Sequence, residues 1–299
     1  MDLVGLSEVA EIAGVSRQAV VNWRARFPDF PVPAAELASG PVWTRDEIEK
    51  WLKKREESTK ETIIDKNVDS GKIQTRSLNL TDFDRVDVGS AIQAKITRSE
   101  VYYIKVDASD YMFNYLDISK SGTALRVRLR SLFWHHWTKV TVLIGMPELR
   151  AIKASGASNI SIEGFNSENP LDVESSGASG IKVKEVKAGK TRFVITGASN
   201  IIGDISFTDG HLQASGASEI ELSGHGGNIH MELSGSSITH LAEFKATYAE
   251  VKMSGASRGS VNLNGKLDAN LSGASRLSYT GEFKMGKLQL TGASSLQQR

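Results

Sequence analysis

Residues 215–218 read SGAS, and this four-residue phrase occurs eight times between Ser155 and Ser294, with Thr or Ser substituted in some copies. Successive copies begin 18 to 21 residues apart, a period typical of stacked repeat proteins. Each copy lies between short runs of alternating apolar and polar residues, which is the period of a strand. Because glycine allows backbone angles closed to other residues, each phrase is predicted to form a bend between two strands. We expect its serines to stack as hydroxyl ladders.

The second and fourth residues before each glycine are predicted to face inward, from Ile152 and Ala154 in the first copy to Leu288 and Leu290 in the last. One such turn cannot bury its apolar face alone, but turns stacked about 4.8 Å apart share a continuous core. The sequence therefore predicts a mostly β protein, a parallel β-helix of about eight regular turns. An antiparallel sandwich is the alternative, because it also uses short strands between turns.

Composition limits the possible functions. The chain has 299 residues, a formal net charge of +1 and no cysteine, which leaves room for two or three domains and excludes disulfides and thiolate metal sites. The net charge gives no general argument for nucleic acid or an acidic membrane. No apolar run approaches the roughly 18 residues of a membrane span, and the N-terminus lacks the pattern of a secretion signal. We therefore expect a location in the cytoplasm.

The first 55 residues differ in character from the repeats. The segment LSEVAEIAGVSRQAVVNWRARF, 6–27, predicts two short helices, and VWTRDEIEKWL, 42–52, predicts a strand followed by a third helix. Thr44 and Glu47 have the spacing of a capping box at the start of that helix. This stretch resembles the winged helix-turn-helix domains of the MerR and excisionase type. The resemblance implies that Arg17, Gln18 and Asn22 face DNA bases and that Ser16, Arg24 and Arg26 reach phosphates.

Charge favours the alternative that this segment is a small three-helix protein-interaction module. Residues 1–60 hold nine Lys or Arg against ten Asp or Glu. We predict a DNA-binding-like domain at 1–55, a polar linker at 56–74 and the β-helix domain at 75–299, whose less regular strands up to Arg150 close one end of the solenoid.

The β-helix domain carries a second resemblance. The segment FDRVDVGSAIQAKITRSEVYYIKVDA, 83–108, is followed by LRVRLR, KVTVLIGMPEL and SGASNI. This arrangement, from about Leu78 to Leu296, resembles the bacterial GIN family, also called the auto-transporter adhesin head domain or DUF2807. The family implies a right-handed β-helix and proteins mostly described as surface or envelope proteins of unknown activity. Its members usually begin with a secretion signal, whereas this chain begins with a helix-turn-helix.

No nucleophile, phosphate-loop or dinucleotide motif occurs in a suitable context, and the six histidines lack helical metal-ligand spacing. We therefore predict no cofactor, no metal and no enzyme activity. Some β-helix enzymes gather carboxylates on an outer face, but a solvated face looks the same. The segment LFWHHW, with Phe133, Trp134 and Trp137, predicts either an exposed interaction loop or, as we favour, a lid on the first turns. The outward acids are Glu163, Glu174, Glu221, Glu232 and Glu250.

These observations lead to a functional hypothesis with alternatives. The main hypothesis is a DNA-binding regulator whose β-helix serves oligomerisation, ligand sensing or scaffolding, with DNA and a second copy of the chain as partners. A small-molecule or glycan ligand stays open. The alternative is a structural or adhesive β-helix protein whose N-terminal domain contacts another protein. An artificial fusion of the two domains is also open, because they share no composition or motif.

Overall fold

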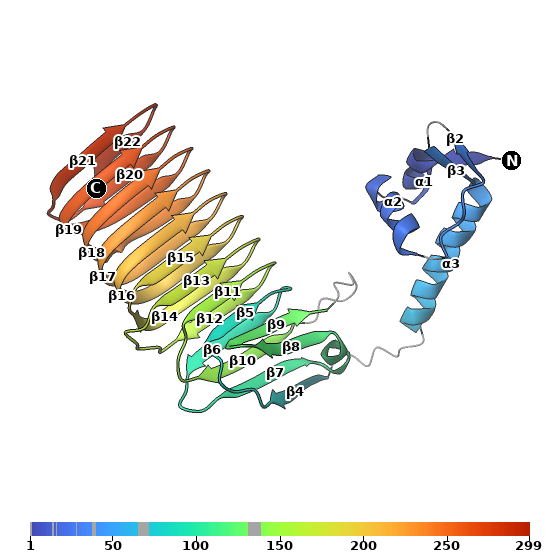
Figure 1. Cartoon of the computed structure of the whole chain (residues 1–299), viewed down its shortest axis with the longest axis horizontal. Coiled ribbons are helices and arrows are strands. Elements are labelled where there is room, and N and C mark those ends of the chain that lie inside the picture. The colour runs from blue at the N-terminus through green and yellow to red at the C-terminus, as the bar shows by residue number, and fades with distance from the viewer. Residues whose placement is uncertain are drawn as a thin grey trace. The chain divides into compact units, whose positions relative to one another are not determined.

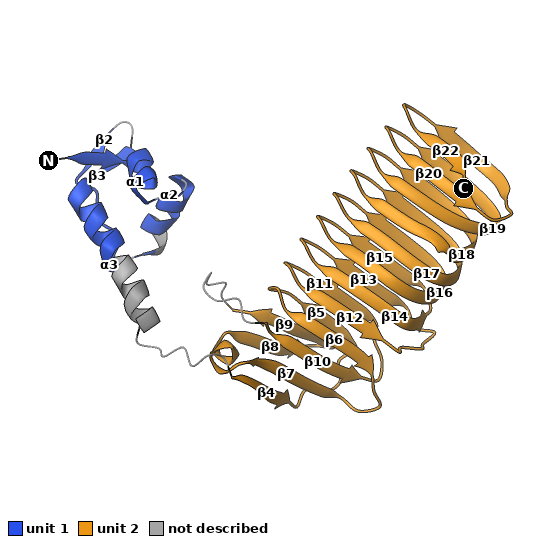
Figure 2. Cartoon of the chain, turned by 180° about the vertical axis from the view of Figure 1, so that it is seen from behind, with its two compact units in different colours: residues 1–70 blue, residues 71–299 orange. Residues whose placement is uncertain are grey.

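The computed structural model describes residues 2–13, 15, 17–27, 29–37, 40–64, 72–130 and 139–299, excepting the side chains of 25, 26 and 55–64. The chain has two compact units, Met1–Ser70 and Gly71–Arg299 (Figure 2). Within the described ranges, no helix is long and apolar enough to cross a membrane.

The first unit contains three helices and a three-stranded antiparallel sheet in the order β1-β3-β2. Its core is aromatic: the Phe30 ring lies edge-on to both Trp43 and Trp51, with centroids 5.7 and 4.8 Å away. The predicted capping contact is confirmed, because the Glu47 backbone N–H donates to Thr44 Oγ1 at 3.3 Å. The elements are β1 (Leu3–Gly5), α1 (Leu6–Ala13), α2 (Arg17–Arg26), β2 (Ala35–Leu37), β3 (Gly40–Thr44) and α3 (Arg45–Ile64).

The structure differs from the predicted linker at both ends. Helix α3 continues to Ile64 and strand β4 begins at Ile73, whereas the linker was predicted at 56–74. Lys, Arg and Glu dominate the segment after Leu52 and have good helix propensity. A helix can therefore continue there without an apolar face.

The second unit is a β-solenoid of about seven turns, with its strands stacked from β5 to β22 (Figure 1). Strands in successive turns pair in parallel, as where Val173 of β13 lies beside Phe193 of β15. This parallel register excludes the sandwich alternative. The turns are formed by β5 (Arg85–Val88), β6 (Gln93–Arg98), β11 (Ala151–Ala154), β12 (Asn159–Glu163), β13 (Leu171–Ser175), β14 (Gly180–Ala188), β15 (Thr191–Ile195), β16 (Asn200–Ala214), β17 (Glu219–Leu233), β18 (Ile238–Met253), β19 (Arg258–Leu271), β20 (Arg276–Thr280), β21 (Lys284–Leu290) and β22 (Ser295–Gln298).

Each SGAS phrase forms a corner, and eight corners enclose seven complete turns. The corner glycines have φ between +69° and +79°, which favours glycine. The fourth residue is buried in the first seven corners. In several corners it closes the bend: Ser218 Oγ donates to the carbonyl of Ser215 at 2.9 Å, and Ser257 does the same to Ser254. The hydroxyls therefore bond mainly within their own corner, and only some, such as Ser199 to Ser175, also reach the preceding turn. The hydroxyls of Ser158 and Ser275 have no hydrogen-bond partner in the described part of the chain.

The two ends of the solenoid differ. At the N-terminal end, antiparallel strands extend the stack of turns. Strand β7 pairs with β4 and β10, and β8 pairs with β9. At the other end, Leu288 and Leu290 were predicted to face inward but are 45% and 43% exposed, because no further turn covers them. The strands at the closed end are β4 (Ile73–Leu78), β7 (Tyr103–Ser109), β8 (Leu116–Ser121), β9 (Ala124–Leu129) and β10 (Thr141–Met146), with a 3-10 helix, η1 (Asp110–Asn114).

Candidate binding surface on the solenoid

Two of the faces that carry outward residues meet at the corner of each turn. We call the outward residues of the strands that precede each corner the charged face; these strands are β5, β11, β13 and β15, followed by the second parts of β16 to β19. We call the outward residues of the strands that follow each corner the amide face; these strands are β6, β12 and β14, followed by the first parts of β16 to β19.

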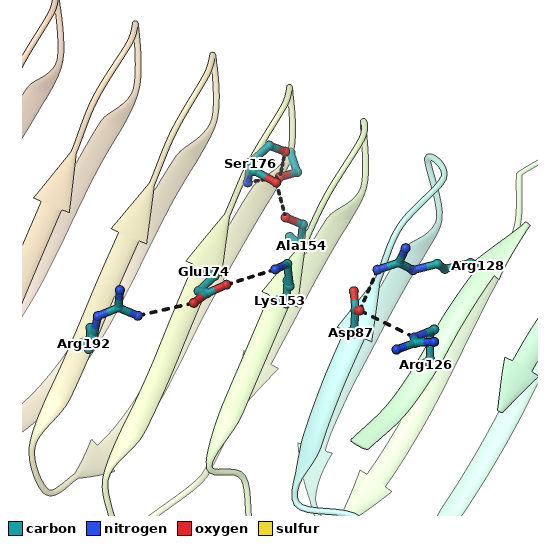
Figure 3. A network of polar contacts seen from close by, with 9 residues as sticks. Asp87, Arg126, Arg128, Lys153, Ala154, Glu174, Ser176 and Arg192 are labelled. Carbon is teal, nitrogen blue, oxygen red and sulfur yellow. Dashed lines mark hydrogen bonds and ion pairs between the residues drawn. The ribbon is translucent and has the colours of Figure 1, made fainter. Parts of the chain in front are cut away.

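On the charged face, acidic and basic side chains of neighbouring turns form ion pairs. Glu174 of β13 accepts an ion pair from Lys153 of the preceding turn at 3.2 Å and one from Arg192 of the following turn at 3.3 Å (Figure 3). Nearer the N-terminal end, Asp87 lies 2.6 Å from Arg128 and 3.9 Å from Arg126. These pairs connect neighbouring turns and leave little free charge for a ligand.

The same matching continues toward the C-terminal end of the charged face. His230 lies 3.0 Å from Glu232 and 3.3 Å from Glu250, and Lys252 lies within 3.6 Å of both carboxylates. The hydrogen bond from His230 lowers the pKa of Glu232. Three of the outward acids considered for catalysis, Glu174, Glu232 and Glu250, therefore each lie within 4 Å of a lysine or arginine of the charged face.

The amide face carries polar side chains that have no hydrogen-bond or ion-pair partner in the described structure. A trough of about 380 Å³ crosses strands β10, β6, β12, β14 and β16. Its exposed amides belong to Gln93, Asn159 and Asn200, and these side chains make no hydrogen bond to any part of the chain that the structure describes. Exposed amides that the protein does not use are hydrated, and a ligand in the hollow can take over these hydrogen bonds.

Gly180 forms the centre of this trough. It lies in register between Asn159 and Asn200 of the adjoining turns. A Cβ at Gly180 would be 2.9 Å from the Asn159 side-chain oxygen and 2.8 Å from that of Asn200. Both amides therefore converge on the space above Gly180, where any other residue would place a side chain.

Lysines give this part of the amide face a positive charge. Glu163 is shared by Lys184 and Lys95, at 2.7 and 3.2 Å, and hydrogen bonds from Lys184 and then from Lys95 lower its pKa. Lys182 is exposed and has no ion pair within the described ranges. Glu185 also lies 3.8 Å from Lys184, so three lysines and two glutamates leave a local charge of +1.

The charge changes sign farther along the amide face. A second hollow of about 680 Å³ shares Lys182 and Ile202 with the trough. Four acids line it, Asp204, Glu219, Glu221 and Glu243, against the bases Lys182, Lys184 and Arg299. Glu219 lies 3.5 Å from His240, and Glu221 is exposed. The amide face therefore offers a basic, amide-rich region followed by an acidic one.

The comparisons with known proteins agree with this fold. The family model described as "Putative auto-transporter adhesin, head GIN domain", DUF2807, matches residues 82–282. The chain belongs to this family. No curated protein matches the chain.

Solved structures of similar fold come from Parabacteroides. A "putative lipid binding protein" of Parabacteroides distasonis is 20% identical with a TM-score of 0.69, and the alignment covers 77% of this chain and 98% of that one. A "putative adhesin" of Parabacteroides merdae is 18% identical with a TM-score of 0.72, covering 77% and 97%. Another "putative adhesin" of P. distasonis has the same identity and TM-score, covering 77% and 98%. At this identity the likeness establishes the fold alone.

The main functional hypothesis, a DNA-binding regulator, is wrong. The matched GIN-domain family is one of adhesin heads, and the similar solved structures are described as adhesins and a lipid-binding protein, so the findings favour the adhesive alternative. The family match also leaves the first unit uncovered, so the winged helix-turn-helix resemblance of 3–55 gains no support.

The structure places most of the residues predicted to contact DNA on α2. Arg17, Gln18 and Asn22 are exposed, and Gln18 donates to Asn22 at 3.3 Å. Arg24 donates to Glu36 of β2 at 2.7 Å, and its guanidinium lies 5.9 Å from the Trp43 ring centroid. Arg24 therefore supports the packing of the first unit. Ser16, the Arg26 side chain and the aromatic segment with Phe133, Trp134 and Trp137 lie outside the described residues.

The amide face was not predicted from the sequence. Its pattern is visible beside the repeat, because the residue after the phrase is Asn159 in the first copy, Gly180 in the second and Asn200 in the third. Only the parallel register shows that these three residues are neighbours.

Proposed function

We propose that the protein is an adhesive binding protein whose solenoid attaches to its partner through the amide face. The observation that carries this proposal is the contrast between the two faces. Charged groups such as Glu174 are paired within the solenoid, whereas Asn159, Asn200 and Lys182 lie beside a hollow and have no side-chain partner among the residues that the structure describes. Membership of the adhesin-head family supports the same function.

The shape of the surface favours attachment over catalysis. The trough and the second hollow are open grooves along a sheet, and an open groove suits an extended partner better than a small substrate that must be enclosed. We therefore propose a binding protein without enzyme activity.

An adhesion assay with the full chain tests this function. Beads that carry the chain would be offered to surfaces coated with mucin, with collagen or with phosphatidylcholine–phosphatidylglycerol vesicles, and their retention under flow would be measured. We expect retention on at least one surface, reduced by the double substitution Asn159→Ala and Asn200→Ala. The control, Gln213→Ala, removes an exposed amide from the charged face and should leave retention unchanged. Equal retention on coated and bare surfaces, or equal loss in the control, would refute the proposal.

Self-association through the β-helix and a cytoplasmic location stay predictions. A second copy would dock on β21, since its Met285, Leu288 and Leu290 are exposed and exposed apolar side chains on a strand favour association. Light scattering of the full chain, compared with Leu288→Glu, measures this association directly.

A further inference from the structure

We propose that the trough of the amide face binds a carboxylated oligosaccharide that lies along the solenoid axis. This ligand class rests on the proposed adhesive function and deepens it. Three features carry the inference: the convergence of two amides on Gly180, the spacing of the turns, and the position of the unpaired lysine.

The amides select for hydroxyl groups. A side-chain amide offers two donors and an acceptor, so a pair of amides can bind neighbouring hydroxyls that each donate one hydrogen bond and accept another. The side-chain oxygens of Asn159 and Asn200 both lie over Gly180, 2.9 and 2.8 Å from where its Cβ would be. They present two acceptors to a ligand hydroxyl, and the amide nitrogens supply the donors. An extended peptide would instead need a free strand edge, and β12, β14 and β16 have both edges paired.

The spacing of the turns fits a chain of sugars. Successive turns are about 4.8 Å apart, and a pyranose unit in an extended glycan advances by a similar distance. Asn159, Gly180 and Asn200 belong to three successive turns, so a glycan along the axis meets one turn per sugar. The half-buried Ile202 beside Asn200 offers methyl groups to the C–H face of a sugar ring.

The charges select for carboxylates at one end of the trough. In the described part of the chain, exposed Lys182 has no ion pair, and the one ion pair of Lys95, to Glu163, is shared with Lys184. Charge-assisted hydrogen bonds from lysine to carboxylate are stronger than neutral ones. Glu219 and Glu221 in the neighbouring hollow would repel an acidic sugar, which places the carboxylates over β6, β12 and β14.

Calorimetric titration of the full chain at low salt tests the ligand class. The probe is hexagalacturonate, and the comparison ligands are maltohexaose, which is neutral, and hexaglutamate, which is a polyanion without sugar hydroxyls. We expect hexagalacturonate to bind at least about tenfold more tightly than either, because the site combines neutral hydrogen bonds with a charge-assisted one.

Gly180→Ala is the decisive variant. Its Cβ would occupy the space above the glycine and meet only the ends of two flexible side chains, and the φ of Gly180 is not in the left-handed region. We expect the melting temperature to stay nearly unchanged and hexagalacturonate to bind about tenfold more weakly, through loss of one or two hydrogen bonds. Lys182→Gln should weaken hexagalacturonate and leave maltohexaose unchanged, and Gln213→Ala should change neither.

The outcomes separate this inference from the proposed function. Unchanged affinity in Gly180→Ala, or equal binding of hexaglutamate, would overturn the glycan site. Retention on collagen or vesicles without binding of any oligosaccharide would overturn the ligand class and leave the adhesive function standing. Binding of hexagalacturonate without retention on any coated surface would support the site and refute the adhesive function on which it rests.

Discussion

A Cβ on Gly216 would lie 2.7 Å from the carbonyl oxygen of Gly197 in the preceding turn. The same carbonyl accepts the N–H of Ala217 at 2.8 Å. The corners therefore stack so closely that glycine is needed for two reasons, its φ of +79° and the absence of a side chain.

Gly216→Val should strongly destabilise the solenoid. Backbone strain at positive φ costs about 1–3 kcal/mol, and the contact with Gly197 adds to this because backbone cannot move aside. Glu221→Lys, an exposed position in the next turn, should change stability by about 0.5 kcal/mol or less. Urea denaturation of both variants measures the difference, and equal midpoints would contradict the role of the corner.

Ser218→Ala should destabilise the protein by about 1 kcal/mol, the usual net value of a buried hydrogen bond. Ser218 is 1% exposed, and its hydroxyl closes the corner by donating to the Ser215 carbonyl. Ser215→Ala removes a hydroxyl from the same corner but leaves that carbonyl in place, so it should cost less. A reversed order in chemical denaturation would show that the buried hydroxyl does not hold the corner.

Asp268 should make the C-terminal turns sensitive to acid. Hydrogen bonds from Lys266, the Lys287 backbone N–H and Tyr248 lower its pKa to about 2, and the bond to Asp268 first and burial second raise the pKa of Tyr248 to about 12. Since the folded pKa is below the unfolded value of 3.8, the stabilisation is complete above pH 3.8 and is lost as pH falls toward 2.

The substitution Asp268→Asn should remove this pH dependence and loosen β21, because Asp268 accepts the Lys287 N–H at 2.6 Å. Asp172→Asn, at an exposed position of the charged face, serves as the control. Hydrogen exchange of the β21 amides between pH 2 and 4 measures the effect. Identical exchange in Asp268→Asn and Asp172→Asn would contradict it.

His211 should contribute stability that is lost at mildly acid pH. Its ring stacks on His230 with centroids 5.0 Å apart, and burial, followed by the charge of His230, lowers the pKa of His211 below 6.5. The unfolded chain then binds more protons than the folded one, so stability should decrease as pH falls from 6.5 toward the lower folded pKa. Melting curves of wild type and His211→Gln between pH 7.5 and 5 measure this, and parallel curves would exclude the contribution of His211.

The repeats could be predicted because each turn repeats the same local chemistry. Alternation fixed the inward positions, so Phe193 and Ile195 are fully buried as expected, and the glycine fixed the corner. Leu288 and Leu290 have the same local pattern but are exposed, because burial in a solenoid is supplied by the following turn. The local sequence pattern of one strand does not show whether another turn covers it.

The first unit shows the limit of resemblance as evidence for function. Its third helix and the capping contact at the start of that helix were predicted from Thr44 and Glu47, since capping depends on residues three positions apart. The engagement of Arg24 by Glu36 depends on how α2 packs against β2. The GIN-domain family, whose description contradicts the DNA-binding hypothesis, is identified from the second unit, since its model matches residues 82–282.

The sequence by itself determined the strands, the corners and the stacked architecture of this protein, because these depend on alternation and on a glycine at a fixed place in every repeat. The tertiary structure decided which polar residues are free. Glu174 and Glu221 are both outward acids in the sequence, but the register gives Glu174 a cation in each adjoining turn and leaves Glu221 exposed. Asn159 and Asn200 are 41 residues apart in sequence and meet over Gly180 only because parallel turns stack in register.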